Sequence, residues 1–227
     1  MARPIVRYFG GKWKVAPWII SHMPKHRVYV DPFGGGGSVL LRKPRAYAEI
    51  YNDLDGEIVN LFRVTRDHGQ ELLQKLELTP FARDEFELTY SDQPECDIER
   101  ARRTVARCFM GFGSNAHAQR TGFRSCSNRS GTTPAHDWRN YPHEIVQIID
   151  RLRGVVIENR PAIEVMRQHD SLETLHYVDP PYVHSTRSAS HRDAYRHEMA
   201  DADHEELCRQ ILELKGAVIL SGYQNEI

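Results

Sequence analysis

Short apolar runs alternate with helical patterns at the beginning of the chain. Apolar runs of four to six residues that end at proline or a polar cluster indicate buried strands. Apolar residues that recur every three or four positions, as Ile58, Leu61 and Phe62 do, indicate a helix. The expected strands are residues 27–31 and 46–53, and the expected helices are residues 14–23, 38–42 and 56–67.

The same alternation returns in the last third of the chain. The expected strands there are residues 155–158, 175–179 and 217–221, and the expected helices are residues 143–152, 162–169 and 201–214. Strands that alternate with helices favour a mainly parallel, doubly wound α/β sheet. The chain shows no internal repeat and no low-complexity tract.

The middle of the chain has a different character. Helices are expected over residues 71–78 and 97–110. Residues 111–142 then combine glycine, serine, threonine and asparagine with few aliphatic residues, which is typical of a functional or irregular segment. We expect an irregular stretch with a hairpin there. The pattern therefore predicts a mostly helical insert, residues 68–150, in an α/β domain made of residues 1–67 and 151–227.

Composition excludes several classes of protein. A hydrophobic content of 40% is enough for a core, but no apolar run approaches the ~20 residues of a membrane span, and the start has no signal-peptide core. The four cysteines form no C-x-x-C pair, which argues against a zinc cage or a disulfide framework and fits a reducing cytoplasm. His204 and Cys208 are one helical turn apart, but no second ligand pair accompanies them. We expect no metal and no membrane partner.

Charge is uneven along the chain. The net charge is -1, yet residues 100–139 contain eight arginines against one acid, Asp137, and so carry about +7. The arginines are Arg100, Arg102, Arg103, Arg107, Arg120, Arg124, Arg129 and Arg139. Such asymmetry suggests a local anionic partner. The alternative is a solvated helix face followed by a polar loop.

A glycine loop follows the first predicted strand. The run from Asp31 to Ser38 reads D-P-F-G-G-G-G-S and leads into a helix. Glycines allow sharp turns and close approach of a ligand, and ligands of open α/β sheets bind beyond the carboxyl ends of the strands. Asp53 ends the second predicted strand, where a carboxylate can accept hydrogen bonds from ribose hydroxyls.

The spacing of the loop narrows the choice of ligand. The dinucleotide pattern G-x-G-x-x-G fails, because the third position counted from Gly34 and Gly36 is Val39. No Gly-Lys-Ser/Thr follows, so a Walker phosphate loop also fails. A nucleoside without a pyrophosphate fits better, and S-adenosylmethionine is such a ligand. The alternative is a tight turn that binds nothing.

A rigid acidic segment follows another apolar strand. In Asp179-Pro180-Pro181-Tyr182, each residue before a proline is restricted to extended conformations. The Asp179 carboxylate and the Pro180 carbonyl can then form a fixed pair of acceptors for an amino group such as N6 of adenine. Tyr182 offers a face for stacking an extruded base. The alternative is a proline turn that only ends a strand.

Together the motifs resemble the Dam-like (D12 class) N6-adenine DNA methyltransferases. The matching segments are residues 7–12 (R-Y-F-G-G-K), the glycine run from Asp31 with Asn52-Asp53 after it, and residues 179–182. The resemblance implies a Rossmann-like S-adenosylmethionine-dependent methyltransferase sheet and the following roles. Tyr8, Lys12, Phe33, Gly34, Gly36, Asp53 and Asp179 bind the cofactor, with Lys12 on its carboxylate and Asp53 on its ribose, while Asp179, Pro180 and Tyr182 hold the target adenine.

The resemblance also assigns residues 68–150 to target recognition in double-stranded DNA. Residues 120–124 (R-T-G-F-R) resemble the core of the family's DNA-binding hairpin, but residues 124–127 (R-S-C-S) depart from its usual continuation, which leaves a GATC target open. The expected DNA-binding residues are Arg120, Arg124, Arg129 and Arg187. A restriction endonuclease for the same site is a further expected partner, and the cytoplasm of a bacterium or of a phage-infected cell is the expected location.

Three alternatives accompany this interpretation. An N4-cytosine DNA methyltransferase shares the amino-group chemistry, although such enzymes commonly have serine at the position of Asp179. The chain stops at Ile227, shortly after its last predicted strand, where the family usually continues with a helix and a β-hairpin. We therefore expect an incomplete sheet with an exposed edge, and a truncated homologue that only binds DNA or cofactor is the second alternative. A nicotinamide-dependent or nucleotide-hydrolysing enzyme is the third.

Overall fold

Five parallel strands form a single sheet in the order β3-β2-β1-β4-β5. The strands are β1 (Val28–Asp31), β2 (Ala48–Asn52), β3 (Val155–Glu158), β4 (Thr174–Val178) and β5 (Ala217–Leu220). Val28 of β1 pairs with Ala48 on one side and with Thr174 on the other. The strand order therefore reverses between β1 and β4, and in open α/β sheets a ligand crevice forms at this point.

The computed structural model describes residues 3–91, 94–114, 116, 118–126, 128, 131–187 and 195–226. Contacts divide the chain into two compact units. Unit 1 consists of Met1–Gly11 and Glu57–Arg153, and unit 2, which holds the sheet, consists of Lys12–Gly56 and Gly154–Ile227. These units are defined by contacts and not by function. The division into a catalytic part (residues 1–67 and 151–227) and a recognition insert (residues 68–150) stays a prediction.

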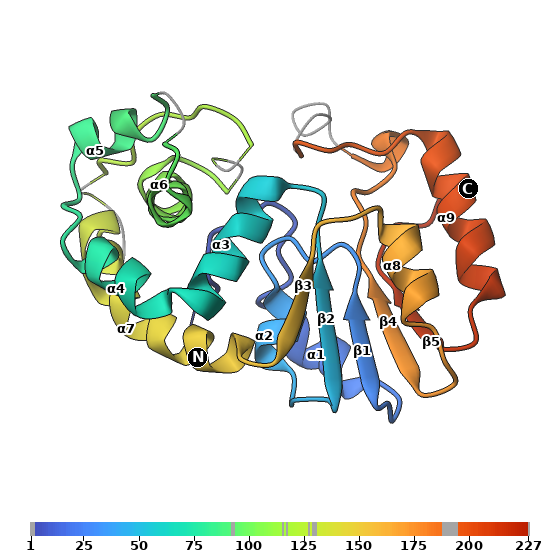
Figure 1. Ribbon diagram of the computed structural model, residues 1–227. Coiled ribbons are helices and arrows are strands. Elements are labelled where there is room, and N and C mark those ends of the chain that lie inside the picture. The colour runs from blue at the N-terminus through green and yellow to red at the C-terminus, as the bar shows by residue number, and fades with distance from the viewer. Residues whose placement is uncertain are drawn as a thin grey trace. The chain divides into compact units, whose positions relative to one another are not determined.

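Helices cover both faces of the sheet in unit 2. They are α1 (Ala16–Ser21), α2 (Ser38–Arg42), α8 (Ala162–Gln168) and α9 (Asp201–Glu213), with a short 3-10 turn at His184–Thr186. Figure 1 shows α8 in front of the sheet and α1 with α2 behind it. Val165 of α8 packs on Val30 and Ile50, while Leu207 of α9 packs with Met166 and Val178. Burial of these aliphatic side chains fixes the sheet between its helices.

The secondary-structure elements described for unit 1 are all helices. Its helices are α3 (Gly56–Asp67), α4 (Gly69–Glu77), α5 (Arg83–Leu88), α6 (Asp97–Met110) and α7 (Pro134–Leu152). The buried rings of Phe109, Trp138 and Tyr141 pack together, with 4.3 Å between the centroids of Phe109 and Tyr141. The buried indole N–H of Trp138 donates to the Thr79 carbonyl at 2.8 Å, so its polar atom is satisfied.

The predicted fold class is confirmed: the chain is α/β, with a parallel sheet and a mostly helical insert. The irregular stretch predicted over residues 111–142 is wrong for residues 134–142, because α7 begins at Pro134 and not at residue 143. Thr133 caps this helix by accepting from the His136 N–H, and proline is favourable in a first helical turn. The apolar positions there are aromatic, as Trp138 and Tyr141, which an aliphatic pattern does not reveal. The helix α5 was also not expected from the sequence pattern.

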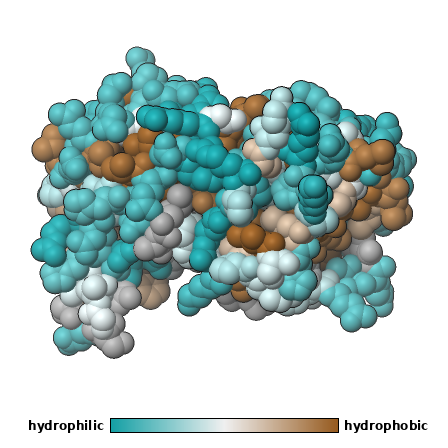
Figure 2. Space-filling view, turned by 90° about the horizontal axis from the view of Figure 1, so that it is seen from below, coloured by the Kyte–Doolittle hydropathy of each residue, from teal (hydrophilic) through white to brown (hydrophobic). Residues whose placement is uncertain are grey.

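Large apolar side chains are exposed at scattered places on both units. They include Trp18, Tyr47, Phe112, Leu172 and Leu212. On the face drawn in Figure 2, hydrophilic residues surround separate hydrophobic patches. In the part of the chain that the structure describes, no helix is both long enough and apolar enough to cross a bilayer.

Candidate cofactor and acceptor site

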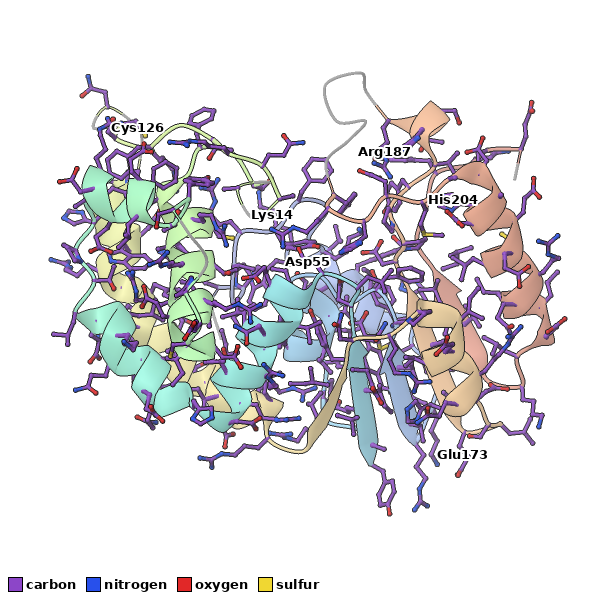
Figure 3. All side chains as sticks on the ribbon, turned by 45° about the horizontal axis from the view of Figure 1, so that its top comes forward. Lys14, Asp55, Cys126, Glu173, Arg187 and His204 are labelled. Atoms are coloured by element: carbon purple, nitrogen blue, oxygen red, sulfur yellow. The ribbon has the colours of Figure 1, made fainter. Side chains whose placement is uncertain are left out.

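Three aspartates meet at the carboxyl ends of the central strands of unit 2. Asp31 is the last residue of β1, Asp53 follows β2, and Asp179 follows β4. The glycine loop, residues 34–37, leaves β1 at the same end of the sheet. Figure 3 shows Asp55 and Arg187 at this end and Glu173, which precedes β4, at the opposite end. The topology thus brings the predicted glycine and acidic motifs to one crevice.

The glycine loop is held by hydrogen bonds to β2 and to the residue after it. Gly35 has a φ of 47°, a conformation that favours glycine. Its N–H donates to Asp53 Oδ2 at 2.8 Å, and its carbonyl accepts from the Tyr51 hydroxyl at 2.7 Å. The Gly34 N–H donates to the Asn52 carbonyl at 2.8 Å. The loop is therefore a fixed turn.

Gly34 is required by packing inside the protein. A Cβ at this position would lie 2.2 Å from a ring carbon of Tyr51, so the ring occupies the space that any larger residue would need. The glycine run is expected from the sequence to allow sharp turns and the close approach of a ligand. For Gly34, the packing of Tyr51 is sufficient. Gly36 is buried in the same loop, and Phe33 packs against the cluster of Met166, Val178 and Leu207.

Asp53 binds two backbone N–H groups. Besides Gly35, the N–H of Asp55 donates to Asp53 Oδ1 at 2.8 Å. Burial raises the pKa of Asp53 from the ordinary 3.8 to about 6, although both hydrogen bonds favour the ionised form. A carboxylate has about four acceptor positions, so Asp53 can still accept from a ligand hydroxyl.

The raised pKa of Asp53 gives a prediction for stability. The unfolded chain loses the Asp53 proton near pH 3.8 and the folded chain near pH 6, so the free energy of unfolding is expected to fall between these values. A difference of about two pKa units corresponds to roughly 3 kcal/mol. Chemical denaturation at a series of pH values should show a loss of stability in the parent protein that exceeds the loss in Asp53→Asn by this amount. Parallel curves for the two proteins would refute the assignment.

Lys12 pairs with Asp179 inside unit 2. Lys12 Nζ lies 2.7 Å from Asp179 Oδ2, and both side chains are about five-sixths buried. Nζ also lies 5.0 Å from the centre of the Tyr182 ring. Burial raises the pKa of Asp179, and the charge of Lys12 opposes that rise. The resemblance assigned Lys12 to the cofactor's carboxylate, whereas in this structure Lys12 forms an ion pair with the predicted catalytic acid.

One oxygen of Asp179 remains available. Asp179 Oδ1 is buried without a hydrogen-bond partner in the described residues, and so is Oδ1 of Asp31. Because buried polar atoms nearly always have partners, these two oxygens at the crevice are suited to accept from a bound ligand. Burial raises the pKa of Asp31 well above its usual range, and the charge of Asp179 raises it further. Sequence reasoning missed Asp31, although an acid at the end of a core strand was a usable signal.

Tyr182 is held by the residue that follows β5. Its hydroxyl and that of Ser221 are 2.9 Å apart, and its ring meets the ring of Tyr223 nearly edge-on, with 5.3 Å between centroids. The Ser221 N–H donates to the Val178 carbonyl at 2.9 Å, which ties the end of β5 to the start of the Asp179 segment. Sequence reasoning did not single out Ser221.

A cavity of about 270 Å³ adjoins the Asp179 segment on the side of β5 and α9. Pro180 and Tyr182 form one wall of it, and His204 and Leu207 of α9 form another. His204 Nε2 is buried there without a hydrogen-bond partner. The cavity therefore combines apolar walls with polar groups that can recognise a ring with donors and acceptors.

Tyr8 belongs to unit 1 and lies at the start of a tight turn. Its carbonyl accepts from the Gly11 N–H at 3.2 Å, and Gly10 has a φ of 70°. The turn explains the glycine at position 10. The cofactor contact of Tyr8 stays a prediction.

Much of the positive charge of the insert is balanced inside unit 1. In α6, Arg100 pairs with Glu57 at 2.6 Å and Arg102 with Glu85 at 2.9 Å. Glu99 pairs with both Arg102 and Arg103 and has a lowered pKa because of these guanidinium groups. For these three arginines the anionic partner is the protein itself.

The four predicted DNA-binding arginines lie in different surroundings. Arg120 is exposed over 68% of its side chain and pairs with Glu87. Arg124 is only 11% exposed and lies 4.0 Å from Asp137. Arg187 is 6% exposed, pairs with Glu198 at 2.8 Å and donates to the Tyr182 carbonyl at 2.6 Å. Arg129 lies outside the described residues. Of the three described, Arg120 has the surroundings expected of a surface contact.

The two ends of the segment 111–123 pair in antiparallel orientation, as the base of a hairpin requires. Gly111 and Phe123 form a β-bridge, and the Phe112 N–H donates to the Gly122 carbonyl at 2.8 Å. The Phe123 ring packs on Phe81 and Phe86, at 5.2 and 5.7 Å between centroids. This aromatic cluster anchors the base of the loop to unit 1.

The five-stranded parallel sheet, with a glycine loop and acids at its strand ends, is that of an α/β protein with a Rossmann-like methyltransferase fold. The chain belongs to the D12 class N6 adenine-specific DNA methyltransferase family, whose sequence model matches residues 8–227. It is 24% identical to the type II methyltransferase M1.LlaDCHI of Lactococcus lactis subsp. cremoris, over 86% of this chain and 71% of the relative. It is 21% identical to the type II methyltransferase M.MjaIII of Methanocaldococcus jannaschii, over 96% and 83%.

Proposed function

We propose that this protein transfers a methyl group from S-adenosylmethionine to N6 of a flipped-out adenine in a specific double-stranded DNA sequence. The observation that carries the proposal is the arrangement of Asp179. It follows a central strand, lies at the same sheet end as the glycine loop, and keeps one buried oxygen without a partner. The family supports methyl transfer to adenine in DNA.

The strand-end acids suit S-adenosylmethionine, which supplies an activated methyl group on a positively charged sulfur. We propose that the glycine loop with Gly34, Gly36 and Phe33 lines the methionine end, and that Asp53 accepts from the ribose hydroxyls. The unpartnered oxygen of Asp31 suits the ammonium group or the sulfonium charge. Lys12 and Tyr8 remain proposed contacts, Lys12 acting through its ion pair with Asp179.

The chemistry at the acceptor needs an amino group with an available lone pair. In adenine this lone pair is delocalised into the ring, so N6 is a weak nucleophile. We propose that Asp179 Oδ1 and the Pro180 carbonyl accept the two N6 protons, which favours a pyramidal nitrogen and stabilises its developing positive charge. Tyr182 stacks on the base, and the adjoining cavity receives part of it.

We propose that unit 1 recognises the DNA through residues 111–124, within the predicted recognition segment 68–150. Phe112 is 70% exposed at the base of this loop, and an exposed aromatic side chain can insert between base pairs. Arg120 adds an exposed positive charge. Since the relatives are type II methyltransferases, we further propose a role in restriction-modification in the cytoplasm, with a cognate endonuclease acting on the same DNA site.

Charge reversal of Arg120 is expected to weaken DNA binding. Arg120→Glu removes one exposed cation, so the affinity should fall about tenfold and the slope of log affinity against log salt should shrink by about one to two. Binding is measured by fluorescence anisotropy with one duplex at several salt concentrations. Arg153→Glu, which alters an arginine 71% exposed elsewhere in unit 1, is the matched control. An unchanged slope for Arg120→Glu would remove this residue from the interface.

The function is tested by incubating the purified protein with labelled S-adenosylmethionine and unmethylated plasmid, followed by nucleoside analysis of the DNA. N6-methyladenine is the expected product. N4-methylcytosine would overturn the choice of acceptor and keep the chemistry. Absence of labelled DNA, together with absence of cofactor binding in a titration of the same sample, would overturn the proposal.

A further inference from the structure

Residues 195–198 form a short segment that is fixed at the β4 side of the crevice. Glu198 pairs with Arg187 at 2.8 Å and accepts from the Tyr195 N–H at 2.9 Å. The guanidinium carbon of Arg187 lies 5.3 Å from the centre of the Tyr195 ring. The next residue, Met199, packs against the core cluster that contains Val178. One end of the segment is therefore tied to the structure that follows β4.

The same segment reaches the end of β2. Arg196 donates to Asp55 Oδ1 at 3.0 Å, and the Asp55 side chain is only 4% exposed. An electrostatic interaction with His197 acts to lower the pKa of Asp53, so His197 lies near the proposed ribose site. Burial raises the pKa of Tyr195, and the charge of Asp179 raises it further, which places Tyr195 near the catalytic segment.

The order of strands in the sheet shows where the segment 195–198 runs. β1 lies between β2 and β4, and neighbouring strands are about 4.8 Å apart. A segment with contacts at both Asp55 and Arg187 therefore crosses the carboxyl end of β1, where the glycine loop lies. Figure 3 shows Asp55 and Arg187 at this same end of the sheet.

We propose that residues 195–198 form the outer wall of the cofactor site and that Arg196, through its ion pair with Asp55, retains the bound S-adenosylmethionine. This inference rests on the proposed function of the site. The Arg196 side chain is 34% exposed, so its ion pair with buried Asp55 can open to solvent and close again. Among variants of one binding site, differences in affinity lie mostly in the dissociation rate.

The test is the dissociation rate of labelled S-adenosylmethionine from the full chain, measured by chasing with unlabelled cofactor. Arg196→Gln is expected to raise this rate about fivefold or more and to change the association rate by less than about twofold. Arg196→Lys keeps the charge and should stay close to the parent rate. Arg209→Gln, which alters an exposed arginine paired with Glu206 on α9, is the matched control.

A second variant separates retention from a general loss of structure. If the ion pair is the cause, Asp55→Asn should release the cofactor as fast as Arg196→Gln, and the double variant should release it no faster than either single one. A parent protein that binds S-adenosylmethionine and an Arg196→Gln variant that releases it at the parent rate would overturn this inference and leave the proposed function intact. A parent protein that binds no S-adenosylmethionine would overturn both.

Discussion

Asp179→Asn is expected to lower the rate of methyl transfer by about a thousandfold or more while cofactor affinity stays within about a factor of ten. The substitution keeps the volume of the side chain but replaces one acceptor oxygen with an NH₂ donor. It also removes the negative charge that would stabilise the developing positive charge on the amino nitrogen. Pre-organised electrostatic groups of this kind contribute about 10²- to 10³-fold each. Single-turnover methylation and a separate cofactor titration measure the two effects.

Because Asp179 also forms an ion pair with Lys12, a loss of stability in the Asp179→Asn variant must be distinguished from a loss of catalysis. Lys12 Nζ lies 2.7 Å from Asp179, and removing one partner of a buried pair costs roughly 3–5 kcal/mol of stability. The melting temperature of the variant is therefore needed, and Asp150→Asn, at a residue 75% exposed, is the matched control. Near-normal turnover by a folded Asp179→Asn variant would show that another residue carries the chemistry.

Gly34→Ala is expected to destabilise the protein by at least about 1–3 kcal/mol, the usual cost of an added methyl in a packed site. The new Cβ would lie 2.2 and 2.5 Å from two ring carbons of Tyr51. This ring has no exposed surface, and its hydroxyl donates to the Gly35 carbonyl, so it cannot turn aside without breaking that bond. Cofactor affinity should fall as well, because the displaced ring supports the glycine loop.

Chemical denaturation of Gly34→Ala measures this loss. Gly122→Ala serves as the control, since its added Cβ would meet nothing within 4 Å. Removal of the obstructing ring, in Gly34→Ala with Tyr51→Leu, should cost less than the sum of the two single changes because the clash disappears. Equal stability of Gly34→Ala and the parent protein would contradict the packing described for this loop.

Local patterns predicted the sheet and its loops well. The apolar strands that end at proline or at a polar cluster give β1 and β4, and the glycine run and Asp179 follow them where the sequence placed them. In a parallel sheet the carboxyl ends of the strands meet, so the strand-end positions alone bring Asp53 and Asp179 to one crevice. Their roles in binding and catalysis stay predictions.

Partners distant in sequence could not be predicted. Lys12 and Asp179 are opposite charges 167 positions apart in the sequence, and only the folded chain shows that they pair. Arg102 was counted as free positive charge, but Glu85 and Glu99 neutralise it. Arg120 is exposed and pairs with Glu87, whereas Arg124 is largely buried and lies 4.0 Å from Asp137. Charge counted along a chain ignores such pairing.

The pairing of β1 with β4 has a consequence for the order in which the molecule forms. Val28 of β1 is hydrogen-bonded within the sheet to a strand that begins only at Thr174, and the whole of Glu57–Arg153 is synthesised between them. On the ribosome, the helices of unit 1 emerge while the centre of the sheet still lacks its neighbour. Contacts of such long sequence separation form slowly, because the intervening chain must be closed into a loop first. The crevice between β1 and β4 is accordingly among the last features of the protein to exist during its synthesis.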